Sequence, residues 1–133
     1  MTDIDQINEF RKEFMGKFYK PINEKDWQKI ISQPNFHIIE IRIDGQLIGL
    51  MLTHIIENLT RKPLILDDCI VKKEYRGYGL GQELYKIFVA LGKNLGADCV
   101  EGATPIENKP TIHIYEKLGF NNRKHNLYRL WLK

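Results

Sequence analysis

A glycine-rich turn at residues 76 to 81 has the residue types of an anion-binding site. It reads Arg76-Gly77-Tyr78-Gly79-Leu80-Gly81 and follows a short apolar run. Where such a turn leads into a helix, the first main-chain N–H groups have no partner inside the helix, and the helix dipole is positive. Glycines let the main chain approach a ligand closely, while Lys72 and Lys73 add positive charge. We therefore expect a phosphate-bearing ligand at this turn.

Other phosphate-binding motifs fit these residues less well. The turn contains no Gly-Lys-Ser/Thr, as a P-loop requires, and its G-x-G-x-G spacing differs from the G-x-G-x-x-G of dinucleotide-binding folds. Short glycine motifs are weak evidence alone, so a tight strand-to-helix turn without a ligand stays the alternative.

Two adjacent acids, Asp67 and Asp68, interrupt the apolar run from Leu64 to Val71. Neighbouring side chains of a strand point to opposite faces, so we expect only one of the two to face a cleft. A carboxylate there could take a proton from an ammonium group, directly or through water, and we favour Asp67. An acid satisfied by the main chain or by a lysine is the alternative.

The elements that position these residues are predicted from hydrophobic periodicity and from turn residues. The stripe Ile4, Ile7, Phe10, Phe14 and Phe18 predicts a first helix with a buried face, and the strand, helix and strand around the glycine turn predict a parallel βαβ unit. The expected elements are a helix capped by Thr2 and ended before Pro21, a helix capped by Asn23 and closed at residues 33–35, hairpin strands 36–43 and 47–56 around Asp44-Gly45, a strand 64–71, a helix from Gly81 to Gly96, a strand 97–103, a helix from Pro110 to Gly119 and a last strand 127–132.

Composition restricts the class of protein. The chain has 133 residues, 43% of them hydrophobic and 28% charged, which predicts one domain over residues 1–133. The hairpin and the βαβ unit predict that this domain is α+β with a mixed, mostly antiparallel sheet. The net charge of +3 is scattered, so we expect no nucleic-acid partner. No apolar run has the length of a membrane span or a secretory leader, so we expect no membrane partner and a cytoplasmic location. Ligand spacing for a metal is absent from the cysteines and histidines, which are Cys69, Cys99, His37, His54, His113 and His125.

Two segments together resemble a known family. The segment from Ile70 to Gly81 resembles motif A of the GNAT superfamily of N-acetyltransferases, with the core Q/R-x-x-G-x-G/A after a valine-bearing strand. Downstream, Asn108 and the run Tyr115-Glu116-Lys117-Leu118-Gly119-Phe120 resemble motif B, in which the asparagine precedes the tyrosine by seven residues. The two motifs stand in the family's order and cover about half of the chain, from Leu64 to Phe120.

The resemblance implies a three-layer α/β/α sandwich in which the strand before the turn and the next parallel strand splay apart. It implies acetyl-CoA as co-substrate without a metal, and Tyr115 as the general acid near the CoA sulfur, the alternative being a core tyrosine. Asn108 would bind the CoA arm, although an asparagine there is equally a helix N-cap. The cofactor-binding residues implied are Ile70, Val71, Arg76, Gly77, Tyr78, Gly79, Leu80, Gly81, Gln82 and Asn108.

The reaction implied is transfer of an acetyl group to a primary amine by direct attack in a ternary complex. A small amine is the favoured acceptor, with a peptide or protein lysine as one alternative and a non-catalytic CoA-binding domain as the other. The chain departs from the family at its start, where a helical pattern replaces a strand, so we expect the family's first strand to be missing or very short. The last strand, Leu127 to Leu132, is a candidate for pairing in a homodimer.

Overall fold

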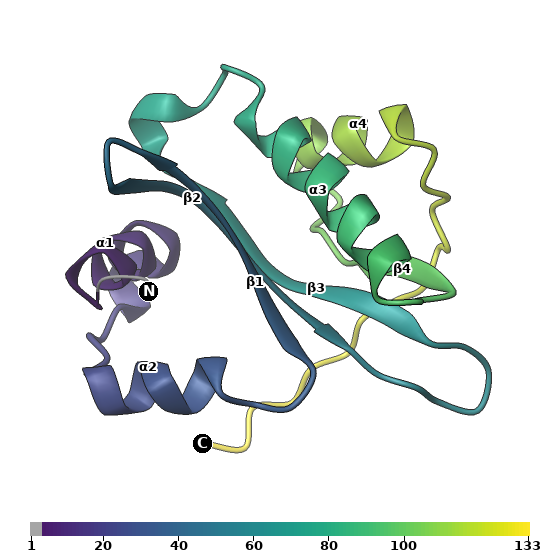
Figure 1. Ribbon diagram of the computed structural model, residues 1–133, viewed down its shortest axis with the longest axis horizontal. Coiled ribbons are helices and arrows are strands. Elements are labelled where there is room, and N and C mark those ends of the chain that lie inside the picture. Colours follow the sequence, from purple (N-terminus) through teal and green to yellow (C-terminus); the bar gives the residue numbers. More distant parts are fainter. Residues whose placement is uncertain (1–3) are drawn as a thin grey trace.

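The structure of the protein is a computed structural model that describes residues 4–133. Over this range a mixed sheet with strand order β1-β2-β3-β4 lies between two helical layers, α1 with α2 on one face and α3 with α4 on the other (Figure 1). The strands are β1 Phe36–Ile43, β2 Gln46–Ile55, β3 Pro63–Val71 and β4 Cys99–Gly102. The helices are α1 Ile4–Met15, α2 Glu24–Ile31, α3 Leu80–Asn94 and α4 Lys109–Lys117, with short 3₁₀ helices η1 Gly16–Phe18 and η2 Lys73–Tyr75. The predicted three-layer sandwich is confirmed.

The hairpin and the βαβ unit form as predicted. β1 and β2 pair antiparallel from Phe36↔His54 to Ile43↔Gln46, and both residues of the connecting turn have positive φ, +49° at Asp44 and +79° at Gly45. Positive φ at both positions suits the twist of a two-residue hairpin. β3 and β4 pair parallel and are joined through α3.

β3 carries an irregularity that opens the sheet. Leu52 of β2 pairs with Asp68, whereas Thr53 pairs with Leu66, so Asp67 is the extra residue of a β-bulge. The pairing of β3 with β4 ends at Leu66↔Gly102, one residue before the bulge. A bulge bends its strand and increases the local twist. Because β4 ends at Gly102, the chain leaves β3 there, and the edge of β3 beyond Leu66 has no strand partner on that side among the described residues.

A separate apolar core forms on each face of the sheet. On one face, Leu84 and Phe88 of α3 pack with Leu64 of β3, and all three are fully buried. On the other face, Phe10 of α1 and Trp27 of α2 cover β2. Burying one such side chain contributes about 1.5–3 kcal/mol, so these contacts fix the helices against the sheet.

The helix ends agree with the predicted caps where the structure describes them. Asn23 Oδ1 accepts a hydrogen bond from the N–H of Asp26 at 2.8 Å and caps α2. Gly96 and Gly119, with φ of +74° and +88°, follow α3 and α4. The predicted cap Thr2 lies outside the described residues. Between residues 4 and 35 the chain forms no strand, in agreement with a missing first strand.

Two predictions about the ends of the chain are wrong. The segment Leu127–Leu132 is not a strand, because β4 has only four residues and no strand of the protomer pairs with this segment. Its large apolar side chains are 73–88% exposed. Phe14 and Phe18, expected in the buried stripe, are 63% and 71% exposed. Phe18 lies in η1, beyond the end of α1 at Met15, and so leaves the helical stripe, whereas Phe14 is within α1. Within the described part of the chain, no helix has the length and apolarity to cross a bilayer.

Candidate active site

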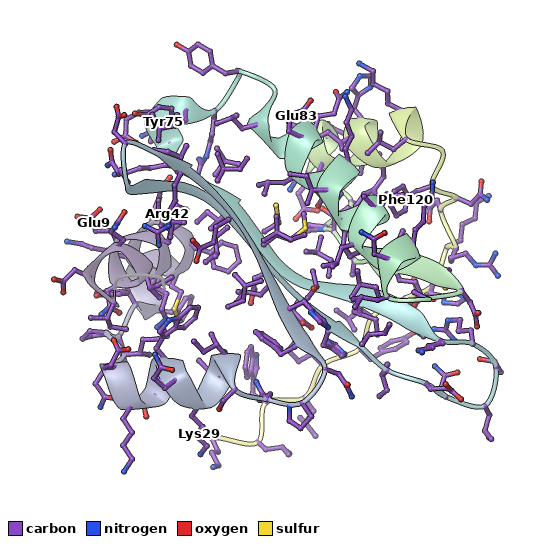
Figure 2. All side chains as sticks on the ribbon, viewed as in Figure 1. Glu9, Lys29, Arg42, Tyr75, Glu83 and Phe120 are labelled. Carbon is purple, nitrogen blue, oxygen red and sulfur yellow. The ribbon has the colours of Figure 1, made fainter. Side chains whose placement is uncertain are left out.

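The glycine turn presents a row of free main-chain donors at the start of α3. Gly79 is the N-cap, no side chain caps the helix, and Gly77 and Gly79 have φ of +86° and +82°. The first hydrogen bond of the helix joins the N–H of Glu83 to the carbonyl of Gly79 at 3.1 Å. Within residues 4–133, no protein acceptor is bound to the N–H groups of residues 77–82, which lie between Tyr75 and Glu83 in Figure 2. This arrangement supplies the unpaired main-chain donors that the predicted anion site requires.

The side chain of Arg76 holds the turn to the rest of the domain. Its Nε donates to the carbonyl of Val71 at 2.9 Å, and its Nη2 lies 2.6 Å from Glu13 Oε1 of α1. Lys72 Nζ lies 3.7 Å from Glu9 Oε2 of the same helix. These two charges are therefore partly neutralised by α1, and the free donors at the turn are mainly those of the main chain.

Tyr115 reaches from α4 to the point where β3 and β4 separate. A side chain at Gly102, the last residue of β4, would collide with its hydroxyl. The ring is held edge-on by Tyr85 and Phe120, each with a centroid distance of 4.9 Å. The hydroxyl is buried without a hydrogen-bond partner in the described part of the chain. Burial raises the pKa of Tyr115, so its phenol is protonated at neutral pH and fits the form of a general acid.

Asp67 and Asp68 line the same cavity, contrary to the expectation that only one would face a cleft. Strict alternation fails here because Asp67 is the extra residue of the bulge. Asp67 Oδ2 lies 2.7 Å from His54 Nδ1, and each side chain is 33% exposed. Partial burial, and then the charge of Asp67, raise the pKa of Asp68. Asp68 therefore holds a proton more readily than an ordinary aspartate.

His54 belongs to this site although the sequence analysis assigned it no role. It stands on β2, where it pairs with Ile65 of β3, one residue beyond the step between Leu52 and Thr53 at which the bulge occurs. Its bond to Asp67 fixes which ring nitrogen faces the carboxylate. The hairpin predicted from the sequence places His54 near one end of a strand. The sequence does not reveal how that strand pairs with β3, so it could not place His54 beside Asp67.

A cavity of about 620 Å³ lies between the α1–α2 layer and the sheet and reaches β3 beside the acids. Most of its walls are apolar, and its polar side chains are Arg11, Gln33, His54, Asp67 and Asp68. Concave, mainly apolar sites with a few polar groups are typical of small-ligand binding. The part of β3 beyond Leu66, which includes Ile70 and Val71, has no β4 partner on one edge. Side chains of the same part of β3, from Asp67 to Ile70, line the cavity.

The remaining candidate residues have observable structural roles. Asn108 Oδ1 accepts from the N–H of Thr111 at 3.3 Å and caps α4. Cys69 is partly buried, and burial raises the pKa of its thiol to about 12, so it is unreactive at neutral pH. His113 is exposed on α4.

Comparison with known proteins agrees with this geometry. The model of the acetyltransferase (GNAT) family matches residues 4–120, and the chain belongs to that family. The chain is 26% identical over 120 residues to a Bacillus subtilis protein provisionally named ribosomal protein bS18-alanine N-acetyltransferase. The aligned residues cover 90% of this chain and 75% of that protein. It is 37% identical over 62 residues to N-alpha-acetyltransferase 30 of Schizosaccharomyces pombe. Those aligned residues cover 47% of this chain and only 41% of that protein.

Among solved structures, an aminoglycoside acetyltransferase from an uncultured soil metagenomic sample superposes with a TM-score of 0.84 over 97% of this chain and 87% of that chain, at 14% identity. This likeness shows the fold. Family membership makes the described domain an N-acetyltransferase domain of the kind that uses acetyl-CoA. The free donors of the turn and the unpartnered hydroxyl of Tyr115 fit that co-substrate.

Proposed function

We propose that this protein transfers the acetyl group of acetyl-CoA to the nitrogen of a small primary amine by direct attack in a ternary complex. The observation that carries the proposal is the continuity of three features along β3. The free N–H row follows its end, its open edge begins at Leu66, and the cavity with Asp67 and Asp68 lies beside it. One side of this strand can thus hold the donor while the other holds the acceptor.

The N–H groups of residues 77–82 would bind the diphosphate of the co-substrate, with the positive end of the α3 dipole behind them. The main chain at Ile70 and Val71 would pair with the pantetheine arm like an added strand. Arg76 already donates to the carbonyl of Val71, and a carbonyl has a second lone pair for another donor. When bound, acetyl-CoA supplies an activated thioester carbonyl.

Proton transfer would use groups on both sides of the opening. An alkylamine is mostly protonated at neutral pH and must lose a proton before it attacks. Asp68, free of an ion pair among the described residues and with a raised pKa, would take that proton directly or through water, with Asp67 held in place by His54. Tyr115 would return a proton to the departing thiolate.

The test combines cofactor binding with turnover. We expect calorimetry to show CoA binding by the purified protein, and thiol detection to show release of CoA from acetyl-CoA only when an amine is added. Binding of CoA without thiol release for any amine or peptide would instead indicate a CoA-binding domain without catalysis.

A peptide or protein amine is the second candidate acceptor, because the Bacillus subtilis relative is named for the acetylation of an alanine of ribosomal protein bS18. Peptides with free N-termini and peptides with internal lysines belong in the same assay. A kcat/KM for a peptide well above that of any small amine would favour this alternative.

The proposal also includes a homodimer and a cytoplasmic setting. Leu127, Tyr128, Leu130, Trp131 and Leu132 leave a run of apolar side chains in water, and a second copy could cover them. Both cysteines are free thiols, which a reducing compartment would preserve.

A further inference from the structure

The cavity beside Asp67 and Asp68 has a strongly uneven distribution of polarity. Its walls away from β3 are formed by aromatic and aliphatic side chains, among them Phe10 and Phe14 of α1, Trp27 of α2 and Leu52 of β2. Its carboxylates come only from β3, at the bulge, with His54 beside them. A ligand in this cavity therefore meets negative charge at one end and apolar surface over the rest.

The positive charge of Arg11 does not alter this arrangement. Its Nη1 donates to the main-chain carbonyl of Lys20 at 2.9 Å, so the guanidinium is held toward the connection between α1 and α2. No other lysine or arginine lines the cavity within the described range. One ammonium group can be stabilised at the acidic end. The rest of the lining is mainly apolar and holds no further carboxylate, with Gln33 as its one neutral amide side chain among the described residues, so a second ammonium group would find no counter-charge there.

From this polarity we infer that the acceptor is a monoamine whose single ammonium group is carried on an aromatic or branched aliphatic body, of the size of 2-phenylethylamine. The inference rests on the proposed function and specifies its acceptor. A polyamine or an aminoglycoside would place further ammonium and hydroxyl groups against apolar walls, and burying such groups without partners is costly. An apolar body gains free energy from the same walls.

Phe14 is the side chain through which this inference can be tested without disturbing the fold. It lines the cavity and is 63% exposed, so its removal leaves no buried void. Phe18 is a matched control, because it is 71% exposed, lies four residues further along the chain and does not line the cavity.

The experiment compares 2-phenylethylamine with ethanolamine, a primary amine with a polar body, and adds kanamycin and a short peptide. We expect kcat/KM for 2-phenylethylamine to exceed that for ethanolamine at least about tenfold, since discrimination through an apolar pocket is of that order. Phe14→Ala should reduce this ratio severalfold, whereas Phe18→Ala should leave it unchanged, with circular dichroism showing that both variants are folded.

Calorimetry separates this inference from the proposed function. The protein without co-substrate should bind 2-phenylethylamine more tightly than ethanolamine, and Phe14→Ala should weaken that binding. If ethanolamine, kanamycin or the peptide is acetylated as efficiently as 2-phenylethylamine, the inferred acceptor class is wrong while acetyl transfer stands. If no amine is acetylated and CoA does not bind, the proposed function is wrong. Separately, equal binding of 2-phenylethylamine and ethanolamine would overturn the inferred acceptor class.

Discussion

Tyr115 is a buried phenol whose hydroxyl lies beside Gly102, where β4 ends and its pairing with β3 stops. If it protonates the leaving thiolate, Tyr115→Phe lowers kcat by about a hundredfold or more and leaves CoA affinity unchanged. Because its pKa is raised, this group should cause no alkaline loss of activity below about pH 10, the ordinary value for tyrosine. Steady-state kinetics and calorimetry check both points, with the exposed Tyr128→Phe as control. Unchanged turnover in Tyr115→Phe would remove this residue from the mechanism.

Asp68 allows activity and stability to be separated. Its folded-state pKa is raised above its ordinary 3.8, so the folded protein binds this proton more tightly than the unfolded chain does. Stability from this group is therefore complete below the ordinary pKa and is lost as the pH rises through the folded-state pKa. At pH 7 we expect Asp68→Asn to keep or raise Tm while kcat/KM falls at least about a hundredfold. A Tm lowered by several degrees would show that the carboxylate has a stabilising partner.

In the proposed function the first turn of α3 binds the diphosphate through its main chain, and the glycine at its N-cap is required for conformation rather than for space. A methyl group at Gly79 would meet nothing within 4 Å, but φ there is +82°, which costs a non-glycine residue about 1–2 kcal/mol. Gly96, at the other end of the same helix, has φ of +74° and equally open surroundings. We expect Gly79→Ala and Gly96→Ala to lose similar stability in urea unfolding. Only Gly79→Ala should weaken CoA binding, at least about tenfold, because its methyl group lies where the diphosphate would approach. Equal CoA affinity in both variants would contradict the diphosphate site.

At the scale of the whole molecule, the apolar segment Leu127–Leu132 is largely exposed and forms no helix or strand. Leu130 and Trp131 are 83% and 78% exposed, and Figure 1 shows the chain leaving α4 without forming another helix or strand. In a homodimer built on this segment, the double substitution Leu130→Ser and Trp131→Ser should convert dimer to monomer in light scattering. The far-UV circular dichroism should stay that of the parent protein. A parent protein that is already monomeric at tens of micromolar would exclude this role for the segment.

Features that depend on near neighbours in the chain could be predicted from the sequence. The hairpin at Asp44-Gly45, the cap at Asn23, the glycine turn before α3 and the end of that helix at Gly96 are decided by φ preferences and side-chain periodicity over a few residues. Tyr115 was identified as a candidate because its motif is local as well. None of these features requires knowledge of which distant segments pack together.

Features that depend on how strands and helices pack were decided only by the tertiary structure. The bulge at Asp67 is a mismatch between β2 and β3, so neither strand alone reveals that both aspartates line one cavity or that His54 contacts Asp67. Phe14 fits an apolar stripe, but only the packing of α1 against the sheet shows that it lines the cavity and stays 63% exposed. Leu127–Leu132 has the pattern of a strand and is not one, because a strand needs a partner in space and the protomer supplies none. The sequence by itself determined the glycine turn with its free N–H groups and the candidate acid Tyr115, whereas register and packing determined the cavity proposed for the acceptor.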